Sequence, residues 1–230
     1  RRTDEHDGRK RAGEDPLTRL PVSPAVGAVL LAAGESSRMG RSKQTLDWGG
    51  RTLLEYQIRT LVEAGVSELV VVFGHRAEKF VPIARTVRDE LKPAKIHFVV
   101  NSSYADGKST SIRAGVHALP ASCDVLIASV DQPRRVDTYR ELLSQHEGSD
   151  AKVSIASYTG RRGHPPLFSR SLRSELASVD EESEGLRSVI ARHADSIRLV
   201  DVADPLVTTN LNTPADYEAA KALFEAGPGS

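Results

Sequence analysis

The chain has 230 residues and a mass of 24.9 kDa, which suits one large α/β domain with a sizeable core better than two small domains. Its 31 basic and 31 acidic residues cancel, and aromatic residues make up 5% of the chain. With so little net charge and so few stacking groups, a nucleic-acid binder is disfavoured.

The opening segment, RRTDEHDGRKRAGEDPLTRLPVSP at 1–24, mixes both signs of charge with glycine and proline and has almost no apolar periodicity. Such a segment cannot offset the entropy cost of ordering, so we expect a flexible leader or a linker at 1–24 and a flexible tail at 227–230. No apolar run reaches the length of a membrane helix, and the leader lacks the apolar centre of a signal peptide. The single cysteine, Cys123, fits a reducing compartment, so we expect a cytoplasmic protein with no membrane partner.

The remaining residues, 25–226, alternate short β-rich runs with longer segments of helical periodicity. Strands are predicted at VGAVLLA (26–32), SELVVVF (67–73), KIHFVV (95–100), DVLIASV (124–130), KVSIASY (152–158) and SIRLVDV (196–202). Helices are predicted within 51–65, where Gly65 ends the pattern, and at 77–91, 110–119, 137–146, 184–193 and 214–224. This alternation predicts a Rossmann-like, doubly wound, mostly parallel sheet in three α/β/α layers.

In such sheets ligands bind beyond the carboxyl ends of the strands, so the loops that follow the strands are the candidate site. The first loop, 32–43, has glycines at 34 and 40, which let the backbone approach a ligand and form a cradle of N–H groups for an anion. Arg38 and Lys43 add positive charge. The spacing matches neither GxxxxGK[ST] nor GxGxxG, so the loop itself would hold the anion; an ordinary glycine turn with solvated cations is the alternative.

The loops after the third and fourth strands add different chemistry. The segment NSSYADGKSTSIRAG at 101–115 is polar and rich in serine, and DQP at 131–133 places a carboxylate directly after an apolar strand. An anion cradle, a nucleoside contact and a carboxylate together predict a triphosphate site with Mg²⁺, which takes one or two carboxylates and leaves its other positions to phosphate and water. The hydroxyls around Ser111 could also cap a helix that begins near Thr110.

The first loop also carries a family resemblance. LAAGESSRMGRSK at 31–43 resembles the LAAGxSxRMGxxK signature of nucleotidyltransferases related to the molybdenum cofactor enzymes. The resemblance continues in family order through NSSYADGKSTSIRAG, VDQP, GRRGHPPLF and NLNTPADY, and so covers about 26–224. The chain is most similar to the molybdenum cofactor cytidylyltransferases, because Ala33 stands where the guanylyl branch has a second glycine and RGHPPLF follows at 162–168. The added Cβ at Ala33 would narrow the base pocket towards a pyrimidine.

The resemblance implies a GT-A-like nucleotidyltransferase fold and a specific reaction. The enzyme would move CMP from MgCTP to the terminal phosphate of molybdopterin or its molybdenum-loaded form and release pyrophosphate, with a molybdenum hydroxylase as a recipient of the product. The acceptor oxygen would attack in line, so the protein mainly positions both anions and neutralises charge. A related transferase that uses GTP or UTP or another phosphate acceptor, and a non-catalytic pterin-binding delivery protein, are the alternatives.

The residues implied by the resemblance fall into four groups. Nucleotide binding is assigned to Leu31, Ala32, Ala33, Gly34, Glu35, Ser36, Ser37, Arg38, Lys43, Gly107 and Ser111. Catalysis is assigned to Arg38, Lys43 and Asp131, acceptor binding to Arg113 and His164, and metal binding to Asp131, Asn210 and Asn212. Relatives more often carry aspartates in the NLNTP segment, and the asparagines here are closer to the pattern of the guanylyl branch.

Several residues near the predicted site are expected to have structural roles. The prolines of GRRGHPP predict a rigid turn, and Trp48 is expected to pack in the core. Arg134 and Arg135 are interpreted as a solvated loop, with extra anion contacts as the alternative. The seven histidines show no HxxxH or HxH spacing, which disfavours a zinc site.

Overall fold

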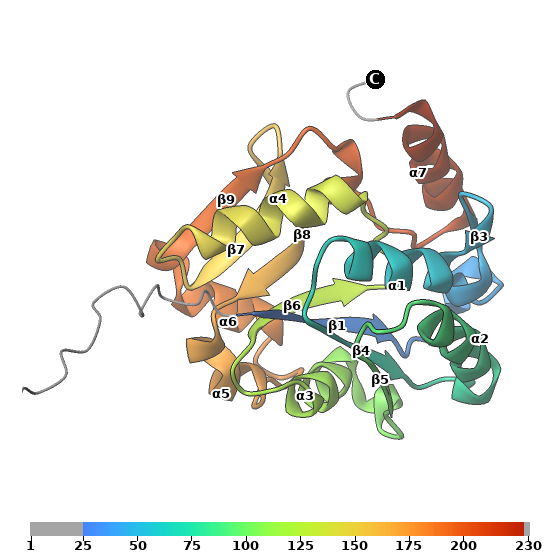
Figure 1. Cartoon of the computed structure of the whole chain (residues 1–230), viewed down its shortest axis with the longest axis horizontal. Coiled ribbons are helices and arrows are strands. Elements are labelled where there is room, and N and C mark those ends of the chain that lie inside the picture. Colours follow the sequence, from blue (N-terminus) through green and yellow to red (C-terminus); the bar gives the residue numbers. More distant parts are fainter. Residues whose placement is uncertain (1–24, 228–230) are drawn as a thin grey trace, which may run out of the picture.

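The computed structural model describes residues 25–227, so the expected leader at 1–24 and residues 228–230 of the expected tail lie outside the described residues. A seven-stranded sheet in the order β5-β4-β1-β6-β8-β7-β9 runs through the molecule (Figure 1). Its strands are β1 (Val26–Ala32), β4 (Glu68–Phe73), β5 (Ile96–Val100), β6 (Asp124–Ser129), β7 (Val153–Tyr158), β8 (Arg161–Phe168) and β9 (Ile197–Asp201). The first four strands of this order are parallel, whereas β8 is antiparallel to both of its neighbours.

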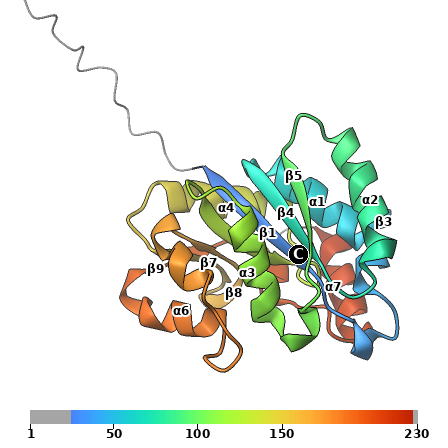
Figure 2. The same cartoon turned by 90° about the horizontal axis from the view of Figure 1, so that it is seen from below.

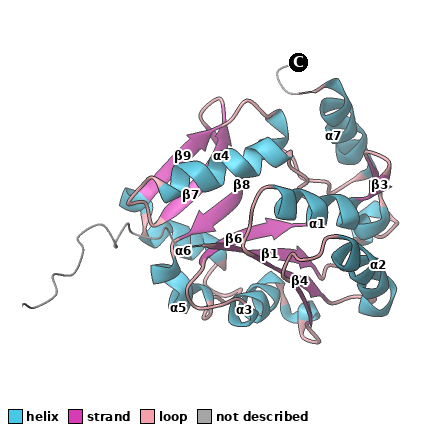
Figure 3. Ribbon diagram, viewed as in Figure 1, coloured by secondary structure: helices cyan, strands magenta, loops and turns pink. Residues whose placement is uncertain are grey.

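The helices form a layer on each side of this sheet, as Figure 3 shows. They are α1 (Leu53–Glu63), α2 (Ala77–Glu90), α3 (Lys108–Ala118), α4 (Val136–Glu147), α5 (Arg173–Leu176), α6 (Leu186–Arg192) and α7 (Pro214–Ala226). Buried side chains of α1, α2, α4 and α7 pack with Ala28 and Leu30 of β1, whereas those of α3, α5 and α6 pack with Val29 and Leu31 on the opposite face. Figure 2, seen from below, shows α3 and α6 in front of the sheet. The predicted three-layer, doubly wound α/β architecture is confirmed.

The parallel half of the sheet positions the site. Leu30 of β1 pairs with Val71 of β4 and with Ala128 of β6, so the carboxyl ends of these strands lie at one edge. The loops that begin at Ala33 and Val130 therefore emerge side by side, as the sequence predicts. Helix α1 follows the short hairpin of β2 (Asp47–Trp48) and β3 (Arg51–Thr52) and starts with a capping box of Thr52 and Glu55. None of the helices within 25–227 is long and apolar enough to cross a bilayer.

The predicted turn at GRRGHPP is wrong, because this segment is most of strand β8. The strand pairs with β7 through Ile155 opposite Pro166, and the register shifts between Ile155 and Ser157. A proline has no N–H to donate to a ladder, and an irregularity in the pairing is where a sheet tolerates it. Trp48 is fully buried among Tyr56, Tyr217 and Phe224, which confirms its predicted place in the core.

Candidate active site

The loop after β1 folds back on itself as a cradle. The Ser36 hydroxyl accepts a hydrogen bond from the Lys43 backbone N–H at 3.1 Å, and the Ala33 carbonyl accepts one from the His75 N–H at 3.0 Å. Ser36 itself has a φ of 60°, and Met39 is buried beneath the loop. These contacts fix the loop at both ends and direct the Lys43 side chain towards the end of β6.

Gln44 also anchors this loop, although the motif resemblance does not single it out. It is 1% exposed, and its Nε2 donates to the Ala32 carbonyl at 2.8 Å. Its Oε1 is buried and has no hydrogen-bond partner within 25–227. A polar residue placed directly after the cationic end of the cradle is the signal that could have identified it.

Lys43, Asp131 and Asn212 meet at the centre of the site. The Lys43 ammonium lies 2.9 Å from Asp131 Oδ2 and 3.3 Å from Asn212 Oδ1. Asn212 is held there because the Leu211 N–H donates to the Asp131 carbonyl at 2.8 Å and because Thr213 caps α7. Segments far apart in the sequence, after β1, after β6 and before α7, thus bring predicted site residues into contact.

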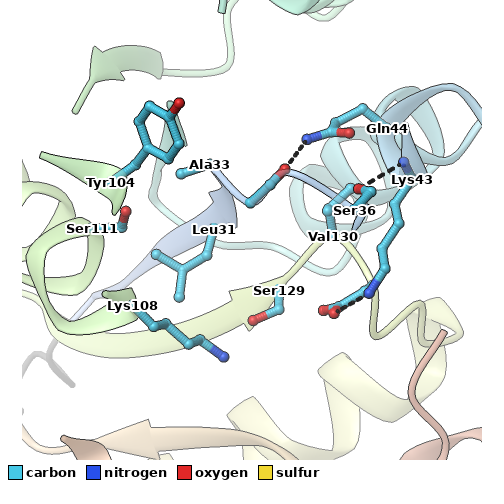
Figure 4. A pocket seen from close by; sticks show the side chains of 12 residues that line it. Leu31, Ala33, Ser36, Lys43, Gln44, Tyr104, Lys108, Ser111, Ser129 and Val130 are labelled. Atoms are coloured by element: carbon cyan, nitrogen blue, oxygen red, sulfur yellow. Dashed lines mark hydrogen bonds and ion pairs between the residues drawn. The ribbon is translucent and has the colours of Figure 1, made fainter. Parts of the chain in front are cut away.

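A cavity of about 240 Å³ lies beside this cluster (Figure 4). Seven predicted residues line it: Leu31, Ala33, Gly34, Ser36, Lys43, Ser111 and Asp131. Gln44, Tyr104, Lys108, Ser129 and Val130, which were not predicted, complete the lining. The cavity combines an apolar end at Leu31 with cationic groups, as a nucleotide site requires.

The other predicted nucleotide residues do not line this cavity. Arg38 is exposed on the 3-10 turn Ser37–Met39, and the structure does not bring it to Lys43 and Asp131. Glu35 is also exposed, with its carboxylate 4.0 Å from His75 Nδ1. Ala32 supplies its carbonyl to Gln44, and Gly107, with a φ of 117°, forms the N-cap of α3.

A second cavity, of about 560 Å³, adjoins the first. Lys108 and Asp131 line both, and the second is further lined by Ser109, Ile112, Gln132, His164, Pro166, Glu181, Glu184, Gly185, Leu186, Arg187, Ile190, Asn210 and Asn212. Of the two predicted acceptor residues, His164 faces this cavity. Arg113 does not line it, and its Nη1 donates instead to the Val179 carbonyl at 2.9 Å.

Arg134 overturns the interpretation of Arg134 and Arg135 as a solvated loop. Its side chain is 0% exposed, so it is neither solvated nor open to a ligand. Its guanidinium donates to the carbonyls of Pro133 at 2.8 Å, His164 at 3.0 Å, Val207 at 3.1 Å and Thr209 at 3.0 Å. Burial lowers the pKa of Arg134 to about 10, so it remains charged at neutral pH. Arg135 is bound to backbone carbonyls at the end of α7.

The Arg134 guanidinium therefore ties three segments of the site together. The carbonyls that accept from it lie in the loop after β6, in β8, and in the turn Pro205–Thr208 with the next residue, Thr209. Gly163 permits the close approach of β8 to this turn, because a Cβ there would lie 2.3 Å from the Val207 carbonyl oxygen. Asp131, His164 and Asn210 stand on the segments that this tie holds in place.

His164 is neutral at physiological pH. Desolvation by burial lowers its pKa to about 4, and the nearby cations Arg134 and Lys108 contribute to the decrease. A neutral imidazole can donate or accept a hydrogen bond in the second cavity without adding charge.

Acid should therefore destabilise the protein through His164. The unfolded histidine titrates near pH 6.5, so between about pH 6.5 and pH 4 the unfolded state binds more protons and stability falls as the pH falls. Between pH 7 and pH 4.5 we expect the wild type to lose about 2 kcal/mol more free energy of unfolding than His164→Gln. Urea unfolding at both pH values measures this difference, with His117→Gln as the control on an exposed histidine. Equal acid sensitivity of the wild type and His164→Gln would contradict the assignment.

The residues at the centre fit a hard divalent cation. Asp131 and Asn212 already direct oxygen atoms at one positive group, the Lys43 ammonium. Asn210 Oδ1, farther out, accepts from Gln132 Nε2 at 2.7 Å. Within 25–227 there is no group of three or more His, Cys, Asp or Glu side chains arranged for a metal, so phosphate and water oxygens would have to complete the coordination.

Comparison with known proteins agrees with this geometry. Residues 28–197 match the family described as MobA-like NTP transferase domain. Nicotine blue oxidoreductase from Paenarthrobacter nicotinovorans is 34% identical over 83% of this chain and 93% of its own length. Molybdenum cofactor cytidylyltransferase from Escherichia coli is 24% identical over 87% of this chain and 97% of its own length.

Solved structures share the fold. A nucleotidyl transferase from Methanothermobacter superposes with a TM-score of 0.70 at 26% identity, and the match covers 88% of this chain and 98% of that one. The family resemblance carried by the first loop is thereby confirmed. The chain belongs to the MobA-like NTP transferase family and is a nucleotidyltransferase by descent.

Proposed function

We propose that the protein transfers CMP from CTP to the phosphate of molybdopterin or of the molybdenum cofactor and releases pyrophosphate. The observation that carries the proposal is the contact of Lys43, Asp131 and Asn212 at the boundary of two cavities, one suited to a nucleotide and one to a second substrate. The Escherichia coli relative named for this activity supports it, since it matches along 97% of its own length.

The first cavity would hold the nucleotide. The backbone of 31–37 would form the cradle, Ser111 would contact the nucleoside, and Ala33 would narrow the base site towards a pyrimidine. Gly107, the N-cap of α3, does not line this cavity. Lys43 would bind the triphosphate by exchanging Asp131 for phosphate oxygens. Arg38, exposed on the turn Ser37–Met39 of the same loop, would bind the outer phosphates. His164 is a better candidate for an acceptor contact than Arg113, because it lines the second cavity.

The chemistry needs no protein nucleophile. An oxygen of the acceptor phosphate attacks the α-phosphorus, the bond from that phosphorus to the bridging oxygen breaks, and the electron pair leaves with pyrophosphate. Lys43 and the N–H groups of the cradle stabilise the charge that builds on the leaving group. Mg²⁺, when bound, would neutralise phosphate charge and orient the leaving group. Asp131 and Asn212, with Asn210 beside them, are the residues that would hold it.

The proposed setting is the reducing cytoplasm, which suits a chain with the single buried thiol Cys123. A molybdenum hydroxylase would be a recipient of the cytidylylated cofactor.

A nucleotide panel tests the first half of this reaction. With Mg²⁺, we expect CTP to raise the melting temperature and GTP, UTP and ATP to have much smaller effects. A ligand at 100 times its dissociation constant adds about 2.7 kcal/mol of stability. The CTP effect should be lost in Lys43→Met and kept in Lys79→Met, since Lys79 lies on the exposed side of α2. A preference for GTP would move the protein to the guanylyl branch suggested by the NLNTP segment.

A second candidate is an oxidoreductase activity on nicotine blue. It is favoured by the relative named nicotine blue oxidoreductase, which is 34% identical over 199 residues. Bleaching of nicotine blue with a reduced nicotinamide dinucleotide as hydride donor tests it. Bleaching without any CTP-dependent transfer would favour this candidate over the first.

A further inference from the structure

Lys108 stands where the two cavities meet. It begins α3 at the carboxyl end of β5 and, together with Asp131, it lines both cavities. Figure 4 shows Lys43 and Lys108 reaching into the first cavity from opposite sides. In a transfer between two substrates, the reacting atoms must meet at the boundary of their sites, so a side chain at this junction is within reach of them.

The two lysines differ in their partners. Lys43 is paired with Asp131, whereas the Lys108 side chain makes no ion pair or hydrogen bond within the described residues 25–227. Lys108 is solvent-exposed in the open cavity, yet the protein around it lowers its pKa by desolvation, and Asp131 and Glu181 oppose that decrease. An ammonium that is partly desolvated and unpaired gains more from an anionic ligand than a fully hydrated one.

The acidic residues near Lys108 are engaged elsewhere. The Glu181 carboxylate accepts the Ser109 N–H at 2.5 Å and so caps the start of α3. The Asp131 carboxylate faces Lys43. Arg187, which also lines the second cavity, makes no side-chain ion pair or hydrogen bond within the same described part of the chain. Glu184 also lines the second cavity. The Lys108 and Arg187 side chains are unpaired within residues 25–227 and available to a substrate anion.

We propose that Lys108 is a further substrate-binding residue, whose ammonium binds the acceptor phosphate and selects an acceptor that attacks through a phosphate monoester instead of a hydroxyl. This inference rests on the proposed function. A hydroxyl acceptor would have to lose a proton to a base, whereas a phosphate dianion attacks directly, forms the new O–P bond and releases pyrophosphate with its electron pair. Lys108 reduces the repulsion between this dianion and the triphosphate that Lys43 holds from the other side.

Two measurements on Lys108→Met, Lys108→Arg and the control Lys79→Met test the assignment. In the first, inorganic phosphate is added to the protein saturated with CTP and Mg²⁺, and the melting temperature is followed. We expect phosphate to stabilise the wild type, Lys79→Met and, more weakly, Lys108→Arg, but not Lys108→Met. In the second, pyrophosphate release is followed against molybdopterin concentration. Lys108→Met should raise KM for molybdopterin about 10- to 100-fold, because one charged hydrogen bond to the substrate is lost. The change in kcat should be smaller.

The two measurements distinguish a failure of the Lys108 assignment from a failure of the proposed function. If the wild type transfers no CMP to molybdopterin but phosphate binding depends on Lys108, the proposed acceptor is wrong and the phosphate site stands. If transfer occurs and Lys108→Met changes neither phosphate binding nor KM, the role of Lys108 is overturned. The role of Lys108 would also be overturned if CTP no longer raised the melting temperature of Lys108→Met while phosphate still bound. Lys108 would then bind the nucleotide instead of the acceptor.

Discussion

Asp131→Ala should lower the rate of pyrophosphate release from CTP and molybdopterin about 10³-fold, as removal of a principal charged group at a phosphoryl-transfer centre does. Asp131 has this weight because it contacts Lys43 at 2.9 Å, lines both cavities and is the carboxylate among the proposed metal ligands. Steady-state release of pyrophosphate, measured with excess Mg²⁺, gives the change in kcat and in KM for CTP separately.

Asp137→Ala is the matched control. Asp137 is an exposed aspartate on α4, 3.2 Å from Arg140, and lines neither cavity. Its loss should leave turnover near the wild-type value. The melting temperature of each variant separates a loss of chemistry from a loss of fold. Full activity of a folded Asp131→Ala would exclude Asp131 from the metal site and from catalysis.

Arg134→Met should destabilise the protein by about 3 kcal/mol, because backbone carbonyls of three segments would lose their donor in a buried setting. Removing a buried charge offsets part of this loss, since burial already disfavours the charged form of Arg134. The side chain is 0% exposed, so methionine, which can fill much of its volume, isolates the effect of the hydrogen bonds. Urea unfolding at pH 7 measures the free-energy change.

Activity should fall further in Arg134→Met than the unfolded fraction accounts for. The segments that Arg134 joins carry Asp131, His164 and Asn210, so losing its hydrogen bonds would move both sides of the second cavity. Arg134→Lys keeps the charge but lacks the several N–H donors of the guanidinium. Compared with Arg134→Met, it should recover part of the stability and little of the activity. Arg85→Met, an exposed position on α2, controls for loss of an arginine. Stability unchanged in Arg134→Met would show that the tie contributes nothing.

The periodicity of apolar residues alone predicts the parallel half of the sheet and its helices. Apolar runs such as that of β1 are covered on both faces, and the predicted helix at 77–91 matches α2 within one residue. The loops after β1 and β6 were found for the same reason, since a parallel sheet brings strand ends to one edge. Seven predicted residues in one cavity follow from that rule combined with the family motif.

Strand β8 and Arg134 could not be predicted from local pattern. Prolines in GRRGHPP indicate a turn, and only pairing with β7 across an irregular register makes the segment a strand. Adjacent arginines indicate a solvated loop, and only the inward carbonyls of β8 and of the turn before α7 make Arg134 buried. Lys108 likewise follows a glycine in a polar loop, and its importance depends on where two cavities meet. Each of these features depends on contacts between distant segments.

The most direct test of the central claim is to follow the α-phosphate of CTP. The protein is incubated with Mg²⁺, molybdopterin and CTP labelled at the α-phosphate, and the products are separated. We predict that the label moves to molybdopterin, that one pyrophosphate is released for each CMP transferred, and that omission of molybdopterin stops the release. A cytidylyltransferase would be contradicted if the label stayed in CTP or appeared as free CMP. Equal transfer of label from GTP labelled at its α-phosphate would also contradict it.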